Sequence, residues 1–575
     1  MAQADDGDFR VSAVRRIVRW PPAEPVGDWP EHWPDLLRRV HAARGSDARA
    51  AMPRLADLLP PSELLGIDAA VQLLRAAIDA DAHILVVGDF DCDGATACAV
   101  GVRGLRLLGA RRVSHAVPNR IVHGYGLTPG LVEELAALQP DLVVTVDHGI
   151  ACHAGIQAAK ALGWQVLVTD HHLPGPALPP ADAIVNPNQP GCGFASKALA
   201  GVGVMFYVLL ALRAAMASKA DLSVLLDLVA VGTVADMVPL DANNRALVGA
   251  GLRRLRAGQG SAGLRALIEV AGRRDATLST ADVGFAIGPR INAAGRLEDM
   301  GIGIECLLTD DAMQARELAA ILHGINDERR ALQADMQDVA DGRLDGIDAT
   351  HAACLFDPDW HPGVVGLVAS KVKERLHRPA IAFAPAEPDG DMLRGSARSI
   401  PGFHVRDALA LVDARHPGLV PRFGGHAMAA GLSLPRDAFP AFRDAFVQVA
   451  REWLDPALLT EELHSDGELR VDDLRADVAV ALRDGGHWGQ GYPEPLFDGE
   501  FEVLGFRVLK ERHLKLELEL GGRRCNAIHF NGWNGEEPGR RIHVAYRLAP
   551  DDYRGGDAIQ LVVVHREAAA ASVPA

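Results

Sequence analysis

The chain lacks several features that mark secreted and membrane proteins. Its 575 residues include only seven cysteines, which are scattered and never in CxxC spacing. We therefore expect reduced thiols, with no disulfide framework and no zinc site. No run of about 18 apolar residues occurs, and the opening residues, MAQADDGDFRVSAVRR, hold no apolar signal-peptide segment. These absences predict a cytoplasmic protein with no membrane span.

Basic residues are also in deficit, because 58 Lys and Arg stand against 75 Asp and Glu, for a net charge of −17. This balance argues against a protein that coats nucleic acid indiscriminately. It does not exclude an enzyme that acts on nucleic acid, since a local basic surface matters more for binding than the net charge of the whole chain. The length indicates about three domains.

Short β-rich segments alternate with Ala- and Leu-rich helical segments from about residue 60. The β-rich segments are HILVVG (83–88), RVSHAVP (112–118), DLVVTV (141–146) and WQVLVT (164–169). Alternation of this kind, with nearly continuous apolar strands, predicts an α/β lobe built on a doubly wound parallel sheet.

The rest of the chain divides by pattern. Apolar residues recur at helical spacing over 311–345 and predict a connecting helix, in which Gly324 is a candidate kink. A second α/β unit follows, and five short strands from about residue 497 predict a small barrel of the OB type. The predicted divisions are an N-terminal arm (1–55), a first α/β lobe (56–310), the connecting helix (311–345), a second α/β lobe (346–454), an OB-like domain (455–568) and a disordered tail (569–575).

Acidic residues follow three of the predicted strands directly, in the segments GDFDCDG, VDHG and TDHH. The carboxyl ends of parallel strands share one edge of a sheet, so these segments should converge there. A fourth segment, GTVADMVPL, follows another apolar run. The predicted cluster contains Asp89, Asp91, Asp93, Asp147, His171, His172 and Asp236.

Crowded carboxylates raise one another's pKa, so a positive group should lie among them. Carboxylates with one or two imidazoles and no cysteine select Mg²⁺ or Mn²⁺, and histidine favours Mn²⁺. Such a set has enough negative charge for two ions. A DxD segment at a strand end is often only a helix N-cap, and an Asp-His pair only a solvated loop. Convergence of three segments favours a metal site and predicts metal-dependent hydrolysis.

These motifs resemble those of the DHH phosphoesterase superfamily, and within it the RecJ family of single-stranded-DNA exonucleases. The resemblance covers about residues 60–560. It implies a DHH catalytic lobe, a DHHA1 substrate lobe and an OB-like domain. The segments that carry it, in order, are DFDCDG, PNRIVHGYGL (118–127), VDHG, TDHH, GTVADMVPL, GPRINAAGRLEDM (288–300), WHPGVVGLVASK (360–371), GSARS (395–399) and FGGHAMAAG (423–431).

The resemblance implies roles for these residues. Two ions, Mn²⁺ or Mg²⁺, would be bound, with Asp147 as the bridging carboxylate, and Asp89 and His172 would be either further ligands or neighbours of the ligands. The implied activity is 5′→3′ degradation of single-stranded DNA to 5′-mononucleotides in repair and recombination, with single-strand-binding protein and a RecQ-type helicase as candidate partners. The implied metal ligands are Asp91, Asp93, Asp147, His171 and Asp236.

Other polar residues are candidates for holding DNA. Asn119, Arg120 and Tyr125 combine an amide, a cation and an aromatic ring in one Gly-containing segment, which suits a terminal phosphate and a stacked base. The alternative for Tyr125 is core packing. Further candidates for phosphate contacts are Arg290, Asn292, Arg296, Arg398 and His426, for which the alternative is a solvated surface.

Glycine-rich segments in the second lobe contain Ser396, Gly424 and Gly425. Backbone N–H groups there could approach phosphates as in anion-binding nests, or these could be ordinary loop glycines. In the predicted barrel, residues 500–545 hold eight Lys and Arg against seven Asp and Glu, with Phe530 and Trp533 nearby. That composition suits either a stacking platform for single strands or simply a charged barrel surface.

Two alternative functions use the same motifs. A relative that hydrolyses small substrates, such as a manganese pyrophosphatase or a short-oligonucleotide phosphatase, would share the metal residues, but it would not need the region 455–575. A non-catalytic replication scaffold would keep the fold and lose metal ligands. Every acidic position of the motifs is filled here, which argues against the scaffold.

Overall fold

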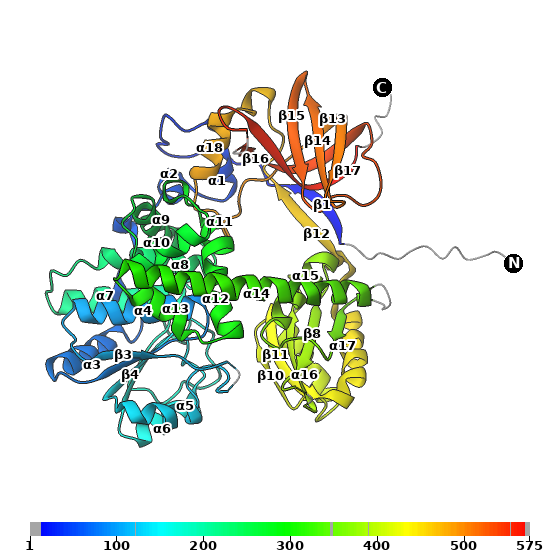
Figure 1. The fold of residues 1–575 in the computed structure, drawn as a ribbon. Helices are drawn as coiled ribbons and strands as arrows, with labels where there is room; N and C mark the ends of the chain where they lie inside the picture. The colour runs from blue at the N-terminus through cyan, green and yellow to red at the C-terminus, as the bar shows by residue number, and fades with distance from the viewer. Residues whose placement is uncertain (1–12, 121, 345–348, 389, 552–553, 570–575) are drawn as a thin grey trace.

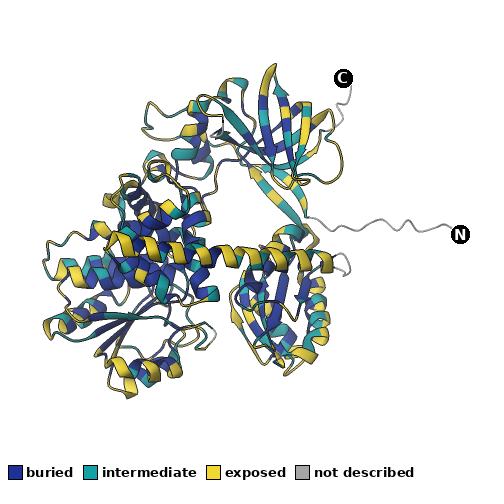
Figure 2. Cartoon of the chain, in the orientation of Figure 1, coloured by how far each residue is buried: buried dark blue, intermediate teal, exposed yellow. Residues whose placement is uncertain are grey.

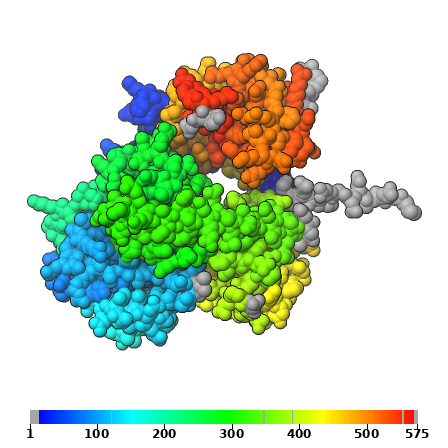
Figure 3. Space-filling model, viewed as in Figure 1, coloured from blue at the N-terminus to red at the C-terminus, as the bar shows by residue number. Residues whose placement is uncertain are grey.

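The chain folds into two α/β lobes and a β-barrel, joined by a long helix and an N-terminal arm (Figures 1 and 3). The computed structural model describes residues 13–120, 122–344, 349–388, 390–551 and 554–569. None of the helices in these ranges is long and apolar enough to cross a membrane. The predicted tail lies outside the described residues from 570 onward.

The first lobe is built on a five-stranded parallel sheet of order β3-β2-β4-β5-β6. The strand order changes direction at β2, which pairs with β3 on one side and β4 on the other, so the edge beyond β2 and β4 is the topological switch point where ligands bind. The strands are β2 (Ile84–Val87), β3 (Val113–Ala116), β4 (Leu142–Val146), β5 (Gln165–Thr169) and β6 (Ala183–Val185). This sheet confirms the predicted doubly wound lobe.

Helices cover this sheet and extend the lobe beyond it. The apolar run before Asp236 forms a helix, α8, so Asp236 follows a helix and not a strand. The helices are α3 (Ile67–Asp79), α4 (Cys92–Leu107), α5 (Pro129–Leu135), α6 (His153–Ala161), α7 (Gly201–Ala215), α8 (Leu226–Ala235), α9 (Ala242–Arg256), α10 (Ala262–Val270), α11 (Thr280–Asp282), the π-helical segment η6 (Val283–Ile287), α12 (Gly288–Leu297) and α13 (Gly301–Leu308).

A single helix, α14 (Ala312–Leu344), connects the two lobes and confirms the predicted connecting helix. It has 33 residues and continues through Gly324, so it is about 50 Å long. Most of its visible face is exposed (Figure 2). Its buried residues pack on the first lobe between Ala315 and Leu322 and on the second lobe between Met336 and Leu344.

The second lobe has a mixed sheet of order β10-β11-β9-β8-β7. The glycine-rich segments lie in the paired strands β9, β10 and β11, so the alternative that these are ordinary loop glycines is wrong. The approach of their N–H groups to phosphates stays a prediction. The elements are β7 (Ala353–Phe356), α15 (Val365–Leu376), β8 (Ala380–Pro385), β9 (Met392–Arg398), α16 (Val405–Arg415), β10 (Arg422–Gly425), β11 (Ala429–Pro435) and α17 (Phe439–Trp453).

The C-terminal strands close into the predicted five-stranded barrel, in the order β13-β14-β15-β17-β16. A strand that the sequence did not reveal, β1 (Val14–Arg19), pairs in parallel with β12 (Thr460–Ser465) between this barrel and the second lobe (Figure 1). The other elements here are α1 (Asp35–Ala43), α2 (Ala48–Ala51), α18 (Ala476–Asp484), β13 (Phe497–Leu509), β14 (His513–Leu520), β15 (Arg523–His529), β16 (Arg541–Pro550) and β17 (Ile559–Ala568).

A buried aromatic cluster joins the N-terminal arm, the first lobe and the segment that leads into the barrel. His41 of α1 stacks on Trp488, with ring centroids 5.0 Å apart, and its Nδ1 accepts a 2.6 Å hydrogen bond from the Tyr492 hydroxyl. Arg245 of α9 lies over the Tyr492 ring at 3.7 Å and donates to the Ala50 carbonyl. Burial, with neighbouring cationic side chains, lowers the pKa of His41 to about 4.

We predict that His41 makes stability depend on pH in weakly acidic solution. The unfolded chain binds a proton at His41 below its ordinary pKa of 6.5, whereas the folded chain keeps it neutral down to about pH 4. The unfolded state therefore binds more protons in this window, and stability falls as the pH is lowered through it. His41 should account for about 2 kcal/mol of loss between about pH 7.5 and about pH 5.

The measurement is urea unfolding followed by tryptophan fluorescence, because Trp33 and Trp488 both stack on His41. A His41→Gln variant should lose less stability on acidification than the wild type. The exposed His32 of the same arm, replaced in His32→Gln, serves as the control. Equal acid sensitivity in the wild type and in His41→Gln would contradict the prediction.

Candidate active site

The edge beyond β2 and β4 carries a tight group of carboxylates around His171. The Nε2 atom of His171 lies 3.1 Å from Asp147 Oδ1 and 3.5 Å from Asp236 Oδ2. All three atoms are buried, and none has a hydrogen-bond partner among the described residues. Buried polar atoms without partners are costly, so their convergence on one point fits a bound cation.

All seven predicted residues of the cluster are brought together. They form three groups whose candidate ligand atoms lie within 4.8 Å of one another. Asp147 belongs to two of these groups, as a bridging carboxylate would. The groups are Asp147, His171 and His172; Asp93, His171 and Asp236; and Asp89, Asp91 and Asp147.

Helix N-termini hold two of these carboxylates in place. Asp91 is the N-cap of α4 and accepts a 3.0 Å hydrogen bond from the Gly94 amide. Asp93 accepts hydrogen bonds from the first two amides of α7, at Gly201 (2.7 Å) and Val202 (2.9 Å). The positive end of a helix dipole favours a carboxylate. The N-cap alternative is therefore correct for Asp91, and it is compatible with metal binding.

The backbone at Asp147 is strained, with φ at +66° in the left-handed region. Strain of this kind in a residue other than glycine often marks a functional position. Gly201 allows this geometry, because a Cβ atom at that position would lie 2.5 Å from the Asp147 Cβ. The first residue of α7 must therefore be glycine for Asp147 to take its place.

Burial and mutual repulsion raise the pKa of four carboxyls of the cluster. The pKa of Asp89 rises to about 8 through burial and the charge of Asp91, and that of Asp236 rises to about 7 for the same reasons. Burial and Asp236 raise the pKa of Asp93 to about 7, and the pKa of Asp147 is also well above its ordinary value. Without a cation, these carboxyls are therefore not all ionised near neutral pH. A bound divalent cation would lower their pKa values and favour the ionised form.

Asp170 is a functional residue that the sequence analysis did not select, although it begins the TDHH segment. Its buried carboxylate accepts a 2.8 Å hydrogen bond from His172 Nδ1, and it also accepts the amides of Ile150 and His171. Although burial opposes a charge on His172, the hydrogen bond and charge of Asp170 raise the pKa of His172 to about 9. A carboxylate that holds one ring nitrogen orients the other toward a ligand.

The loop between β3 and α5 brings Arg120 and Tyr125 beside this cluster. The Arg120 guanidinium lies 3.9 Å from the centre of the Phe90 ring, and its Nε donates to the Gly295 carbonyl. The Tyr125 hydroxyl is 3.4 Å from the ring nitrogens of His172. Tyr125 is 46% exposed, so it is not a core residue. The side-chain oxygen of Asn119 accepts the amide of Val122 within the loop.

The three candidates on α12 have different surroundings. Asn292 accepts the Cys92 amide at 2.8 Å and so supports the DFDCDG segment. Arg296 is part-buried beside Arg120 and Arg398, and burial together with these charges lowers its pKa to about 9. The alternative that Arg296 lies on a solvated surface is therefore wrong. Arg290 is not brought to the cluster, because its side chain is buried and donates to the Ala286 carbonyl of its own helix.

The second lobe reaches the cluster through two side chains. His426 stacks on His172 with ring centroids 6.2 Å apart. Arg398 of β9 lies near Arg120, and its Nη1 donates to the Ser396 hydroxyl at 2.9 Å. Gly424 and Gly425 of β10 are exposed beside His426. Cationic side chains from both lobes thus face the carboxylates, as an anionic substrate would require.

Comparison with known proteins places these features in one family. Models described as the DHH family N-terminal domain, the DHHA1 domain and the RecJ OB domain match residues 83–233, 348–453 and 465–565. A protein from Dickeya dadantii (strain 3937), named single-stranded-DNA-specific exonuclease RecJ, is 48% identical over 577 residues, or 96% of this chain and 99% of that one. The chain belongs to the RecJ family.

Solved RecJ structures from Thermus thermophilus share the whole architecture. One, in complex with Mn²⁺, has a TM-score of 0.81 at 32% identity and covers 98% of this chain and 81% of its own. Another, with Mg²⁺, has a TM-score of 0.76 at 30% identity, covering 96% and 78%. The predicted DHH lobe, DHHA1 lobe and OB-like barrel of this RecJ-family chain are therefore confirmed.

Replacing Asp147 should distinguish the effect of charge repulsion on stability from the effect of metal binding. Without metal, Asp147→Asn removes a buried like charge and should raise the stability by on the order of 1 kcal/mol. Mn²⁺ at 100 times its Kd should stabilise the wild type by about 2.7 kcal/mol, and this gain should be lost in the variant.

Thermal unfolding with EDTA and with Mn²⁺ measures both effects. The exposed Asp338 of α14 provides the matched control, Asp338→Asn, which should respond to Mn²⁺ as the wild type does. If Mn²⁺ stabilised Asp147→Asn as much as the wild type, Asp147 would not be a ligand.

Proposed function

We propose that this chain is a metal-dependent exonuclease that degrades single-stranded DNA from its 5′ end to 5′-mononucleotides, in repair and recombination. The observation that carries the proposal is the convergence of Asp147, His171 and Asp236 on one point with buried, unpartnered ligand atoms. Membership of a family whose curated relatives are named single-stranded-DNA-specific exonucleases supplies the substrate class.

The residues fit two divalent ions, Mn²⁺ or Mg²⁺. Oxygen and imidazole donors without cysteine suit these metals. The bound ions would supply positive charge to the phosphoryl oxygens and favour loss of a proton from the attacking water. The proposed ligands are Asp91, Asp93, Asp147, His171 and Asp236, with Asp147 shared. The hydrogen bond from His172 Nδ1 to Asp170 leaves Nε2 to serve as a ligand, and His172 forms a group with Asp147 and His171, which favours His172 as a further ligand.

Other residues of the chain bind and orient the strand. Arg120, Arg296 and Arg398 surround the approach to the carboxylates, where each could grip a phosphate with two N–H groups. The half-exposed Tyr125 is available to stack on the terminal base. Asn119 closes the loop that carries both Arg120 and Tyr125. Ser396 fixes Arg398, while Gly424 and Gly425 leave room beside His426 for a backbone phosphate.

Further parts of the proposal follow from family membership and the sequence. We propose that the domain limits are those predicted above, and that the protein works in the cytoplasm. Single-strand-binding protein and a RecQ-type helicase are its proposed partners. The barrel surface around Phe530, which is 59% exposed, is a proposed platform for single strands.

The direct test uses a 5′-labelled single-stranded oligonucleotide with Mn²⁺ or Mg²⁺. The wild type should release labelled mononucleotide from the first time point. Asp147→Asn, which keeps the shape of the side chain but removes its charge, should be slower by more than about 100-fold. Asp338→Asn should match the wild type, because Asp338 is exposed on α14.

The other outcomes are equally informative. A ladder of shortened labelled fragments would mean cleavage from the 3′ end or within the strand, and would overturn the direction. Absence of cleavage with either metal would favour a small-substrate phosphatase or a scaffold. Those two are separated by assaying pyrophosphate and a dinucleotide with the same preparation.

A further inference from the structure

The two histidines of the cluster lie where the pairing of two strands ends. β5 ends at Thr169, and its neighbour β6 ends at Val185. A backbone hydrogen bond from the Asp170 amide to the Val185 carbonyl, at 3.1 Å, extends the pairing by one residue. Beyond this bond the strands no longer fix the chain, so the backbone of His171 and His172 needs other partners.

Side chains supply these partners, and every backbone N–H and C=O group of the two histidines forms a hydrogen bond. Asp170 Oδ1 accepts the amides of His171 and His172, at 2.7 and 3.0 Å. Asn188 Nδ2 donates to the His171 carbonyl at 2.6 Å. Asn186 Nδ2 donates to the His172 carbonyl at 2.9 Å. The histidine backbone is therefore held from both sides, by its own strand and by the segment that follows β6.

The two asparagines belong to one turn, Asn186–Asn188, which we call the asparagine turn. Asn186 Oδ1 accepts the Asn188 amide at 2.7 Å, and Pro187 between them has a fixed φ angle. Asn186 is fully buried, and Lys197 Nζ donates to the Pro187 carbonyl at 2.6 Å. A side chain can orient a ligand only if its own position is fixed, and this turn meets that condition.

The asparagine turn is also linked to the helix that supports the carboxylates. Asn188 Nδ2 donates to the Lys197 carbonyl at 3.2 Å, and a short segment leads from Lys197 to Gly201, the first residue of α7. The Gly201 amide binds Asp93, and the absence of a side chain at Gly201 makes room for Asp147. The histidines and these carboxylates are therefore positioned relative to one another through one segment of the chain.

The two histidines are oriented in different ways. His172 is held through its ring, because Nδ1 donates to Asp170. His171 is held through its backbone, by Asp170 and Asn188. Its Nε2 lies 3.1 Å from Asp147 Oδ1 and 3.5 Å from Asp236 Oδ2, and His171 belongs to two of the three candidate ligand groups. A shift of its backbone would therefore disturb both groups.

We propose that Asn186 and Asn188 are positioning residues of the metal site, which hold the backbone of His171 and His172 so that both imidazoles can reach the ions. The inference rests on the proposed function and extends it to two residues outside the sequence motifs named above. Loss of either amide leaves a histidine carbonyl without its donor and frees the backbone of a ligand. Replacing such a partner of a metal ligand typically lowers metal affinity or activity by about 10- to 100-fold.

The test measures Mn²⁺ binding without DNA, from the electron paramagnetic resonance signal of free Mn²⁺. Asn188→Ala and Asn186→Ala should each weaken Mn²⁺ binding by about 10- to 100-fold. Asn188→Gln keeps an amide at a half-buried position and should bind Mn²⁺ more tightly than Asn188→Ala. In the cleavage assay, the Mn²⁺ concentration that gives half the maximal rate should rise in both alanine variants. The KM for the DNA strand at saturating Mn²⁺ should change by less than about twofold, because no substrate contact is removed.

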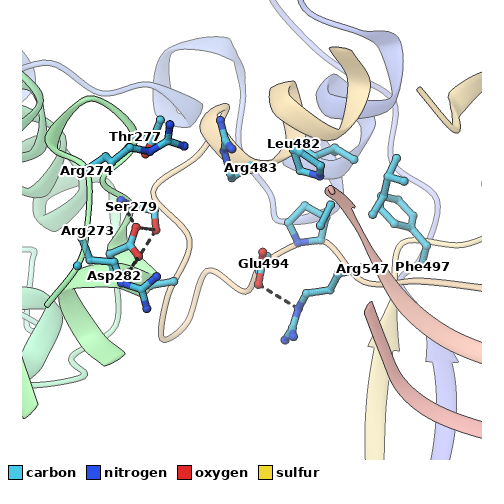
Figure 4. A pocket seen from close by; sticks show the side chains of 16 residues that line it. Arg273, Arg274, Thr277, Ser279, Asp282, Leu482, Arg483, Glu494, Phe497 and Arg547 are labelled. Carbon is cyan, nitrogen blue, oxygen red and sulfur yellow. Dashed lines mark hydrogen bonds and ion pairs between the residues drawn. The ribbon is translucent and has the colours of Figure 1, made fainter. Parts of the chain in front are cut away.

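Two control variants lose stabilising hydrogen bonds that do not involve the histidines. Gln189→Ala removes an amide next to the asparagine turn, which donates to the Leu65 and Ile184 carbonyls. Ser279→Ala removes the N-cap of α11, where Ser279 and Asp282 bond to each other beside the cavity between the first lobe and the barrel (Figure 4). Loss of this cap should cost about 1 kcal/mol of stability. Both controls should bind Mn²⁺ as the wild type does, although urea unfolding in EDTA should show a loss of stability.

Two outcomes would overturn the positioning role. One is wild-type affinity for Mn²⁺ in both Asn186→Ala and Asn188→Ala. The other is a loss of affinity in Gln189→Ala as large as in these two variants, which would mean that any damage to this segment weakens the site. A wild-type protein that binds no Mn²⁺ would instead contradict the metal site, and with it the proposed function.

Discussion

Mutual repulsion among buried carboxylates is the constraint around which the first lobe is arranged. Two unit charges 4 Å apart repel by about 4 kcal/mol at an effective dielectric constant of 20. The lobe places Asp93 against the N-terminus of α7 and Asp91 at the N-terminus of α4, where helix dipoles offset part of this cost. The repulsion that these dipoles do not offset acts on Asp147. Its backbone is strained, and its Oδ1 has no hydrogen-bond partner among the described residues. A bound divalent cation would offset the remaining negative charge of these carboxylates.

Substrate handling depends on a second constraint, the placement of the second lobe and the barrel around this cluster. The contact between His426 and His172 brings the second lobe to the carboxylates, while α14 holds the two lobes at opposite ends of one helix. The barrel is fixed differently, through the aromatic cluster of His41, Trp488 and Tyr492, and through the buried ion pair of Arg44 and Asp466 at 2.7 Å. The N-terminal arm therefore acts as the joint between catalytic lobe and barrel.

The sequence predicted the catalytic cluster well because its signals are local. Buried parallel strands give continuous apolar runs, and the residues after them must meet at one edge of the sheet. The pairing of β1 with β12 could not be predicted, since its partners are 446 residues apart and neither segment is strongly apolar. The same holds for His41, whose partners Trp488 and Tyr492 lie far along the chain. In the sequence, the glycine-containing strands β9 and β10 resembled loops. A strand is usually recognised from its side chains, and glycine has none, while the pairing of the strands is not visible in the sequence.

Asp170 shows a different limit of sequence patterns. It belongs to the segment that drew attention to His171 and His172, yet its own role depends on which atoms its carboxylate accepts. Burial and hydrogen-bond partners distinguish a metal ligand from a residue that positions it, where composition does not.

We expect this cluster to hold two divalent ions with Asp147 between them. Anomalous diffraction at the manganese edge, from crystals grown with Mn²⁺, tests it most directly. Two peaks about 3.5–4 Å apart, bridged by the Asp147 carboxylate, are expected. One ion peak, or peaks away from Asp147 and His171, would contradict it.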